Sequence, residues 1–310
     1  MKIHKIHLNS VVDLGQINLC IGNFDGIHLG HQKVIQTLVK ESNTSNSESA
    51  LMSFYPHPRQ FFSEVNNNFN IVTEDFKINF LKALKIKHYI ILKFDETIAS
   101  LTPDNFIEKI LIKKLNIFNL YIGEDFKFGK DRKGDVKLLI EKSKIYNFNV
   151  SIIKKVKSKN TFEVFSSSLV RQNIQKGNFE KVYSILGRNW ILAGEVIFGD
   201  QRASKMNFPT ANIVPPNLIH PKKGVYVINA LYEKKIYQGI ANFGERPTIK
   251  GKKLLLEVHL FNFNKNIYGK NLTVEFVTFI RDEKKFESFE KLVEQIHKDI
   301  QIAKNYHYKK

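Results

Sequence analysis

The stretch Ile21–His31 reads IGNFDGIHLGH, and it decides how the first half of the chain folds. It follows Ile17–Ile21, a short apolar run that is typical of a buried strand. It precedes Gln32–Glu41, whose apolar residues recur at helical spacing. The chain must therefore turn sharply from a strand into a helix. Because the free N–H groups and the dipole of a helix start attract negative charge, the pattern predicts an anion site here.

Two histidines mark this turn. His28 and His31 lie three residues apart and therefore share a face of the predicted helix. Imidazoles titrate near neutral pH and can stabilise charge that develops on a phosphate. Histidines at this spacing alone are more often ordinary surface residues. The surrounding strand, helix and glycines favour a phosphate site instead, and its predicted binding residues are Gly22, Phe24, Asp25, Gly26 and Gly30.

Length and composition set broad limits. The 310 residues suffice for one large domain or two of medium size, and 43% hydrophobic with 25% charged residues excludes wholesale disorder. The single cysteine, Cys20, excludes an internal disulfide and a thiolate cluster, and its apolar surroundings predict a core residue. We find no signal-peptide pattern and no apolar run long enough to span a membrane. We therefore expect a soluble, cytoplasmic protein.

The formal net charge of +18 raises the question of a polyanionic partner. Clustered lysines would favour nucleic acid, but here they are scattered through every part of the chain. The sequence has no recognition helix, aromatic RNA-binding motif or basic tail to accompany them. We expect small anionic substrates, and neither nucleic acid nor a membrane as a partner. A weak homo-oligomer is left open as the alternative to a monomer.

Strands and helices alternate through the first half of the chain. Further apolar runs predict strands at Ala50–Tyr55, His88–Phe94, Leu120–Gly123 and Val150–Val156. Helical periodicity falls between them, at Phe76–Leu84, Pro103–Lys114 and Asp135–Tyr146. This alternation is typical of a parallel, doubly wound α/β sheet, in which ligands bind beyond the carboxyl ends of the strands.

Two further segments of this half can bind ligands. The loop Gly123–Asp135 combines glycines and aromatic side chains with Asp125, although by itself it reads equally well as a solvated basic turn. Phe165–Arg171 reads FSSSLVR and opens another helical segment. Its serines can cap that helix, and its hydroxyls and arginine can also bind phosphate oxygens. The candidates in the two segments are Asp125, Phe126, Phe128, Ser167, Ser168 and Arg171.

The pattern changes after Leu186. Strand-like runs are now separated by turns and no longer by helices, at Trp190–Phe198, Gly224–Tyr232, Lys235–Asn242, Leu254–Phe261 and Asn271–Phe279. Short antiparallel strands at this density predict a small closed β-barrel. After them, Ser288–Tyr306 carries apolar residues on one helical face, with Ser288 as its cap. We expect this helix to pack on the barrel.

Two features of the second half point to chemistry. In the segment NFPTAN, Thr210 and Asn212 offer neutral oxygens that suit magnesium beside ATP phosphates. A segment of this kind alone is usually a plain turn with capping residues. Glu257 lies in the apolar run LLLEVHLF, so it either alternates out to solvent or serves as a base for an attacking hydroxyl.

These motifs occur together in the order of one family. GNFDGIHLGH, FYPHP, GEDFKFG with RKGD, SSSLVR, FPTAN, GVY, ANFGERPT, LEVHLF, YGK and RDEKKF resemble the bacterial bifunctional riboflavin kinase/FMN adenylyltransferase family, also called FAD synthetases. The resemblance covers nearly the whole chain. It implies a Rossmann-like nucleotidylyltransferase domain at residues 1–185 that adenylylates FMN with ATP. It also implies a riboflavin kinase domain at 186–310, folded as a six-stranded antiparallel β-barrel with a terminal helix.

The resemblance implies a role for each candidate residue. His28 and His31 would stabilise the transferring phosphoryl group, and Glu257 would be the catalytic base of the kinase. The leaving pyrophosphate would be held by Ser167, Ser168 and Arg171. Magnesium and ATP would be held by Thr210 and Asn212, with Gly199 also on the ATP side. The flavins would contact Asp125, Phe126 and Phe128 in the first domain, and Gly224, Tyr226 and Arg281 in the second.

The chain departs from the family pattern in two places. Ser168 stands where the family has threonine, and the hydroxyl is kept. GDQRASKMNFPTAN replaces the usual GDKRGRxLGFPTAN, so that Ala203, Ser204 and Asn207 differ. Asn is the least costly replacement for a glycine at positive φ. Ala203 is therefore the substitution that we expect to affect kinase efficiency.

Two other functions stay open on the sequence alone. Another nucleotidylyltransferase with the same histidine signature would use the first half and leave FPTAN and Glu257 without a role. A nucleic-acid-binding protein on that fold would use the net charge of +18 and bind with a steep salt dependence.

Overall fold

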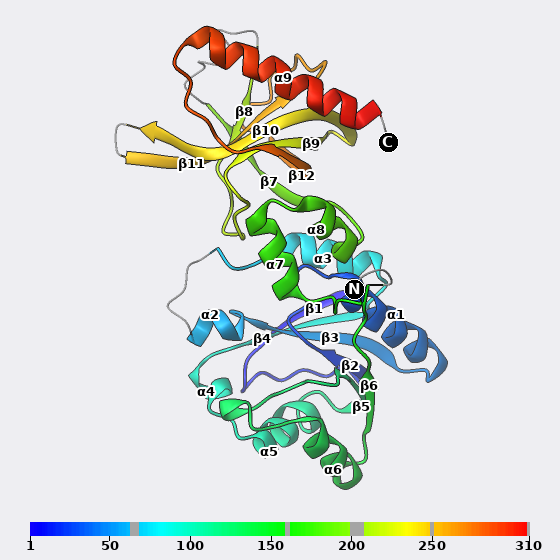
Figure 1. The fold of residues 1–310 in the computed structure, drawn as a ribbon. Coiled ribbons are helices and arrows are strands. Elements are labelled where there is room, and N and C mark those ends of the chain that lie inside the picture. Colours follow the sequence, from blue (N-terminus) through cyan, green and yellow to red (C-terminus); the bar gives the residue numbers. More distant parts are fainter. Residues whose placement is uncertain (63–67, 159–161, 199–207, 249–250, 309–310) are drawn as a thin grey trace. The chain divides into compact units, whose positions relative to one another are not determined.

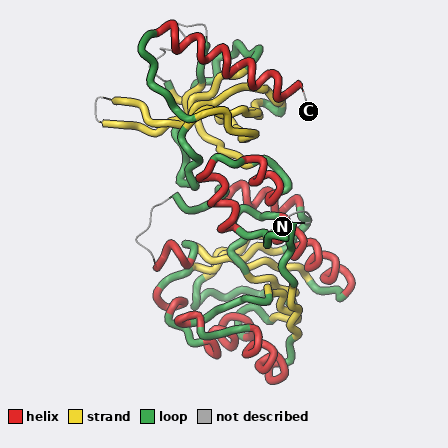
Figure 2. The backbone as a smooth tube through the Cα atoms, in the orientation of Figure 1, coloured by secondary structure: helices red, strands yellow, loops and turns green. Residues whose placement is uncertain are grey.

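The computed structural model describes residues 1–62, 68–158, 162–198, 208–248 and 251–308. It divides into two compact units, of which the first comprises Met1–Asn67 and Thr73–Ser167 (Figure 1). The second comprises Asn68–Val72 and Ser168–Lys310. Helices and strands alternate in the first unit, whereas strands dominate the second (Figure 2). Residue 185 lies inside the second unit, so a boundary there between functional domains stays a prediction.

The first unit is built on a parallel sheet of six strands in the order β1-β4-β3-β2-β5-β6. The strands are β1 (Lys2–Ile6), β2 (Ile17–Ile21), β3 (Glu48–Tyr55), β4 (His88–Lys93), β5 (Ile117–Gly123) and β6 (Asn149–Ile153). Every residue of β2 is buried, which explains why this strand reads as an uninterrupted apolar run. The predicted parallel α/β sheet is confirmed.

Helices cover both faces of this sheet. They are α1 (Leu29–Thr44), α2 (Pro58–Phe62), α3 (Glu74–Ala83), α4 (Glu96–Ala99), α5 (Pro103–Phe106), the π-helix Ile107–Ile112 and α6 (Val136–Tyr146). α1 and α3 share an apolar core with Cys20, while α5, the π-helix and α6 share another with Leu19 and Ile21. Successive residues of a strand point to opposite faces, which is why neighbours in β2 enter different cores. Cys20 is the buried core residue that the sequence predicts.

Three local features differ from the sequence prediction. The strand β1 is missed, because KIHKI is short and half polar and lies at the edge of the sheet. α1 continues to Thr44, beyond the predicted helical segment that ends at Glu41. The predicted helix Pro103–Lys114 is one turn of α-helix followed by the π-helix.

The second unit is built on a closed barrel of antiparallel strands in the order β10-β11-β8-β7-β12-β9. They are β7 (Trp190–Ile197), β8 (Ala211–Ile213), β9 (Gly224–Tyr232), β10 (Lys235–Thr248), β11 (Gly251–Leu260) and β12 (Asn271–Arg281). The six-stranded barrel is confirmed. β8 has only three residues, too few for an alternating pattern, so the sequence predicts a turn where the structure has a strand.

Two helices precede the barrel in the chain, α7 (Ser167–Lys176) and α8 (Phe179–Leu186). Phe179 stacks on Trp190 and on Phe276, with ring centroids 5.8 and 5.0 Å apart. All three rings are almost completely buried. α8 is therefore part of the apolar core of the second unit, which is why the compact unit begins before residue 186.

The terminal helix α9 (Phe289–Tyr308) follows the barrel and covers part of its outer surface. Ile300 and Ala303 pack with Val225 and Ile240 of the barrel, as the apolar face of the sequence predicts. Ser288 Oγ accepts a hydrogen bond from the N–H of Lys291 at 3.3 Å and caps the helix. Among the helices of the described residues, none combines the length and the apolarity that crossing a membrane requires.

Candidate active sites

The first candidate site lies where the order of the parallel sheet reverses. β2 lies between β3 and β5, and the chain proceeds through β3 and β4 on one side and through β5 and β6 on the other. Ligands of such sheets bind at this switch point, beyond the carboxyl ends of the strands. Gly22 follows β2, and its N–H donates to the carbonyl of Met52 at 3.0 Å. We call the segment from Gly22 to His31 the histidine turn. The topology thus brings the histidine turn and the loop after Gly123 to the same edge of the sheet.

His28 is held at the start of α1, which it caps. Its Nδ1 accepts a hydrogen bond from the N–H of His31 at 3.3 Å, so a neutral His28 ring carries its proton on Nε2. The two imidazoles stack with centroids 3.7 Å apart. Gly30 permits this arrangement, because a Cβ there would lie 2.9 Å from the His28 ring. The structure therefore brings the predicted histidine pair together at a helix N-terminus.

His31 is an uncharged imidazole with an unused nitrogen. Burial, followed by the charges of His28 and Lys77, holds its pKa well below the usual range. His31 Nδ1 and Asn23 Oδ1 are buried without a hydrogen-bond partner in the described part of the chain. Since buried polar atoms normally have partners, two such atoms in one turn indicate a place for a ligand.

The turn itself has an unusual backbone. Phe24 and Ile27 have positive φ of 49° and 40°, and Gly26 has φ of 80°. A β-branched residue rarely adopts this conformation, which persists only where the surrounding fold enforces it. Asp25 is buried, and its carbonyl accepts a hydrogen bond from the Ser167 hydroxyl at 2.8 Å. Ser167 is thus joined to the histidine turn, as a shared phosphate site requires.

The loop after β5 contains three predicted flavin contacts. Asp125 is exposed and pairs with Lys155 at 3.0 Å. Phe126 and Phe128 stack with centroids 5.7 Å apart. Phe128 is buried in the apolar core against Phe106, whereas Phe126 is half-buried. Phe128 therefore supports the loop, and Asp125 and Phe126 remain its accessible members.

Ser168 and Arg171 belong to the second unit. Ser168 is exposed in the first turn of α7. The guanidinium of Arg171 lies 3.8 Å from the centroid of the Phe69 ring, and its Nε donates to the Phe69 carbonyl at 3.0 Å. These contacts fix the arginine within its unit, and its role in binding phosphate stays a prediction.

The second candidate site is a row of polar residues across three strands of the barrel. Asn242 on β10 lies opposite Glu257 on β11, which in turn lies opposite Asn212 on β8. Residues paired in this way point to the same face of a sheet. On β9, Val225 pairs with Asn242 and packs in the cluster under α9. The row therefore lies on the outer face of the barrel, beside the terminal helix.

An arginine holds the Glu257 carboxylate. Arg246 donates to Glu257 from Nε at 2.9 Å and also from Nη2, and its Nη1 donates to Glu283 at 2.9 Å. Burial opposes the charge of Arg246, but the bonds to both carboxylates outweigh it and raise its pKa. Asn242 Nδ2 lies 3.5 Å from Glu257 and 3.3 Å from Glu283. Arg246, Asn242 and Glu283 are functional candidates that the sequence analysis misses, although ANFGERPT and RDEKKF contain them.

Thr210 and Asn212 were predicted to hold magnesium. The Asn212 side chain is buried, and within the described residues no hydrogen bond engages it or the Thr210 hydroxyl. Such oxygens fit magnesium, which takes few protein ligands and keeps several waters. No group of three or more His, Cys, Asp or Glu residues in the described ranges could hold a metal. Outside those ranges lie the predicted Gly199 and the departures Ala203, Ser204 and Asn207.

The flavin contacts predicted on the barrel have different surroundings. Gly224 has φ of 148°, and a Cβ there would overlap the carbonyl of Arg281. Tyr226 is fully buried, its hydroxyl donates to the carbonyl of Lys222, and burial raises its pKa. Arg281 pairs with the buried Asp299 of α9 at 2.7 Å. These contacts show that all three residues support the fold of the barrel. That they also contact flavin stays a prediction.

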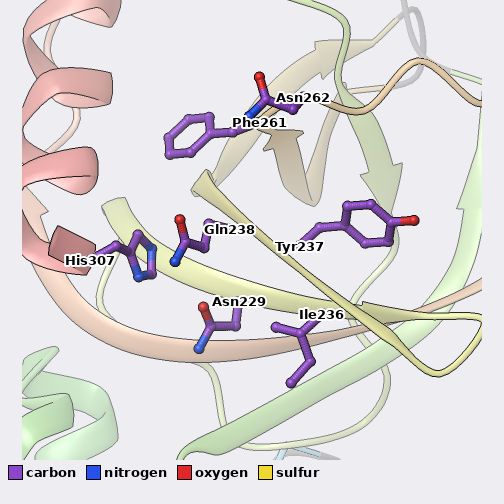
Figure 3. A pocket seen from close by; sticks show the side chains of 7 residues that line it. All are labelled: Asn229, Ile236, Tyr237, Gln238, Phe261, Asn262 and His307. Atoms are coloured by element: carbon purple, nitrogen blue, oxygen red, sulfur yellow. The ribbon is translucent and has the colours of Figure 1, made fainter. Parts of the chain in front are cut away.

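A pocket of about 610 Å³ opens elsewhere on the outside of the barrel (Figure 3). It is lined by Asn229, Ile236, Tyr237, Gln238, Phe261, Asn262 and His307, from β9, β10, the turn after β11 and α9. Gln238 and Asn242 lie at different positions along β10, so the pocket is displaced along the strand from Glu257. Its lining contains no residue that the sequence analysis predicts for either site.

Comparison with known proteins assigns both units. A family model described as FAD synthetase matches residues 12–168, and one described as riboflavin kinase matches residues 186–307. Three similar proteins are each described as a bifunctional riboflavin kinase/FMN adenylyltransferase. That of Buchnera aphidicola from Schizaphis graminum is 40% identical over 98% of this chain and 96% of its own. Those of Haemophilus influenzae and Bacillus subtilis are 39% and 35% identical, covering 92% and 98% of this chain and 92% and 97% of their own.

A solved structure shares the whole fold. A crystal structure from Streptococcus pneumoniae, described as a macrolide-efflux protein, aligns with a TM-score of 0.86 at 28% identity. The alignment covers 97% of this chain and 99% of the other. The description as an efflux protein applies to that molecule, whereas the shared architecture agrees with the parallel sheet and the barrel described above.

Transfer of phosphoryl or nucleotidyl groups from ATP is the chemistry that suits both candidate sites, and the fold with these sites defines a transferase with two active centres. The matches then identify the particular family. The chain belongs to the bifunctional riboflavin kinase/FMN adenylyltransferase family. It is an enzyme with riboflavin kinase and FMN adenylyltransferase activities, which produce FMN and FAD.

Proposed function

We propose that the chain makes FAD from riboflavin in two ATP-dependent steps, with one active centre in the sheet unit and one in the barrel. In the barrel, riboflavin becomes FMN. In the first unit, FMN becomes FAD and pyrophosphate is released. The observation that carries the proposal is that each unit has its own assembled centre: the stacked pair His28 and His31 at the switch point, and Glu257 opposite Asn212 on the barrel.

In the first unit the nucleophile is a phosphate oxygen of FMN. It attacks the α-phosphorus of ATP, the bond to the bridging oxygen breaks, and pyrophosphate leaves with the electron pair. No base is needed, because a phosphate monoester is already ionised at neutral pH. His28 and His31 stabilise the charge on the transferring group, together with the N-terminus of α1. The phosphates would favour protonation of His31, which is neutral beforehand.

Other residues of this step bind and position the substrates. The glycines of the turn let phosphates approach the backbone N–H groups closely. The phosphate-binding turn consists of Gly22, Phe24, Asp25, Gly26 and Gly30. Charge-assisted bonds to the leaving pyrophosphate come from Ser167, Ser168 and Arg171. The flavin side is formed by Asp125, Phe126 and Phe128.

In the barrel the nucleophile is the terminal hydroxyl of the ribityl chain of riboflavin. Glu257 accepts the hydroxyl proton as the oxygen attacks the γ-phosphorus of ATP, and ADP leaves with the electron pair of the broken bond. Thr210 and Asn212 would hold magnesium, which when bound neutralises charge on the ATP phosphates. Gly199 would contact ATP, and the flavin side would consist of Gly224, Tyr226 and Arg281.

We place this protein in the cytoplasm, with riboflavin, FMN and ATP as its partners and without nucleic acid or a membrane. A weak homo-oligomer stays open. The functional boundary is placed near residue 185. It is supported by the family model of riboflavin kinase, which begins at residue 186.

The test is to incubate the purified chain with riboflavin, ATP and magnesium and to separate the flavins by chromatography with fluorescence detection. FMN followed by FAD is expected. FAD from added FMN, without product from riboflavin, would locate the fault in the kinase half and point to the sequence departures Ala203, Ser204 and Asn207. Turnover of a different phosphate acceptor without flavin chemistry would overturn the proposal, as would salt-dependent binding of RNA alone.

A further inference from the structure

The contacts of Glu257 divide its two carboxylate oxygens, and the inference drawn from them rests on the proposed role of Glu257 as the kinase base. Arg246 donates to Oε2 from both Nε and Nη2, and Asn242 Nδ2 is directed at the same oxygen. In the described ranges of the chain, no hydrogen bond reaches Oε1. The carboxylate therefore has one oxygen that is held and one that can accept the proton of a substrate hydroxyl.

Arg246 is itself held in place. Its Nη1 donates to Glu283 at 2.9 Å and to the carbonyl of Glu245 at 3.0 Å. Gly244 makes room for the first of these bonds, because a Cβ at position 244 would overlap the Glu283 carboxylate. Every nitrogen of the guanidinium is thus engaged, and the arginine presents a fixed fork to Glu257.

The charges of this cluster do not cancel. Here one guanidinium is shared between two carboxylates, so the group of three keeps a net negative charge. The three side chains are only 27 to 32% exposed, so solvent screens these interactions incompletely.

We infer that Arg246 is a positioning residue of the kinase step. It holds Oε2 of Glu257 so that Oε1 meets the hydroxyl of riboflavin. Glu283 holds the other side of the guanidinium, so that Arg246 stays aimed at Glu257. A lysine cannot replace Arg246, because one ammonium group cannot bridge two carboxylates with the same planar geometry.

The other charged groups around the cluster have partners of their own. Glu245, next to Arg246 in the sequence, pairs with Lys223 at 2.7 Å and with Lys252 at 3.6 Å. Asp282, next to Glu283, pairs with Lys222 at 2.7 Å. From α9, Asp299 faces the barrel and is neutralised by Arg281. These pairs remain intact in the variants proposed below and form a constant electrostatic background.

The experiment measures kcat and KM for phosphorylation of riboflavin by the full-length chain. Arg246→Lys is expected to lower kcat on the order of a hundredfold with little change in KM, because the base loses its orientation. Glu283→Gln removes the charged partner of Arg246 Nη1, so the guanidinium is held less firmly. Its kcat is expected to fall about tenfold, again with little change in KM.

Gly244→Ala provides the same test without removing a charge. It displaces the flexible Glu283 carboxylate from Arg246, so its kcat is expected to fall in the same way as that of Glu283→Gln. The matched control is Glu233→Gln, which removes an exposed carboxylate paired with Lys265 at the turn between β9 and β10. Its kcat and KM are expected to stay unchanged.

The outcomes separate this inference from the proposed function. Adenylylation of supplied FMN and the thermal unfolding of each variant report whether the chain is folded. Should Glu257→Gln retain kinase activity, the proposed role of Glu257 fails. Should Glu257→Gln lose it while Arg246→Lys, Glu283→Gln and Gly244→Ala all keep a normal kcat, the positioning inference alone is overturned.

Discussion

The histidine turn of the first unit and the carboxylate cluster of the barrel (Arg246, Glu257 and Glu283) position their functional side chains in different ways. In the turn, backbone geometry does most of the positioning: His28 caps α1, and Gly30 leaves room for its ring. In the barrel, charged side chains position one another, with Arg246 between Glu257 and Glu283. The two sites therefore depend on different interactions.

The two nucleophiles of the proposed reactions account for this difference. The phosphate of FMN is already an anion when it attacks ATP, so this step calls for donors for the developing charge and for a neutral His31 that can become charged. The hydroxyl of riboflavin must lose a proton as it attacks ATP, so this step calls for a base that is correctly aimed. The comparison therefore predicts that each site can be disabled without the other.

The largest effect is expected for Glu257→Gln, which keeps the shape of the side chain and removes the base. Phosphorylation of riboflavin should fall at least a hundredfold, because general bases contribute about that much or more. Adenylylation of supplied FMN should not change. Initial rates with riboflavin and with FMN as separate substrates measure both, and a parallel loss of the two would refute the assignment of separate sites.

The converse variant is His31→Ala. Product formation from riboflavin should stop at FMN, with adenylylation slowed on the order of a hundredfold because a charge-stabilising donor is removed. His7→Ala, which removes an exposed histidine, is the control. Normal output of FAD from His31→Ala would contradict the role given to the histidine pair.

How much of these sites the sequence predicts depends on how local their contacts are. His28, His31 and Gly30 lie within one short motif, so their proximity follows from the turn between a strand and a helix. Phe128 is part of an equally local motif, but the core that buries it comes from distant elements such as Phe106. Aromatic residues in a loop therefore do not reveal which ring meets a ligand.

The carboxylate cluster of the barrel is formed by residues from different strands, and the sequence pattern does not predict their contacts. Arg246 and Glu257 lie on neighbouring strands, and Glu283 follows the last strand. Their meeting depends on the register of β10 with β11 and on a glycine at position 244, neither of which the alternation of apolar residues specifies. The sequence pattern predicts where the strands are. Which side chain contacts Glu257 can be known only once the pairing of the strands is known.

A smaller effect is expected for Gly30→Ala, which tests whether the backbone of the histidine turn positions His28. In Gly30→Ala the new Cβ lies 2.9 Å from the His28 ring, so the ring must turn and loosen its bond to the N–H of His31. Alanine favours helices more than glycine does, so helix propensity does not oppose the variant. Adenylylation should fall about tenfold, with kinase activity unchanged. The control is Gln36→Ala on the exposed face of α1, and an unaltered rate in Gly30→Ala would mean that the orientation of His28 is unimportant.

The smallest effect concerns a second histidine pair, at the opposite edge of the same sheet. His4 Nε2 and His88 Nδ1 are 3.0 Å apart, and His88 Nε2 also bonds the Glu48 carboxylate. His88 and Glu48 are the first residues of β4 and β3, so this cluster lies at the amino edge of the strands. Because ligands of such sheets bind at the carboxyl edge, we expect this pair to influence stability and leave the catalytic rates alone.

The sign of its pH dependence follows from two shifts. Burial, followed by the charges of His88 and Lys2, lowers the pKa of His4 from its usual 6.5, and the hydrogen bond from His88 lowers the pKa of Glu48 from 4.5. The unfolded chain thus takes up both protons at higher pH than the folded chain, so the free energy of unfolding decreases on acidification. The His4 contribution is lost as pH falls below 6.5, and that of Glu48 is lost below 4.5.

His4→Gln should therefore flatten the loss of stability between neutral and mildly acidic pH, whereas Glu48→Gln should act only at lower pH. Urea titrations at a series of pH values measure both effects. Adenylylation at neutral pH should be normal in each variant. An unchanged pH dependence of the free energy of unfolding in His4→Gln would contradict the stabilising role of this pair. Adenylylation as slow as in His31→Ala would show that a histidine pair at the amino ends of the strands also affects catalysis.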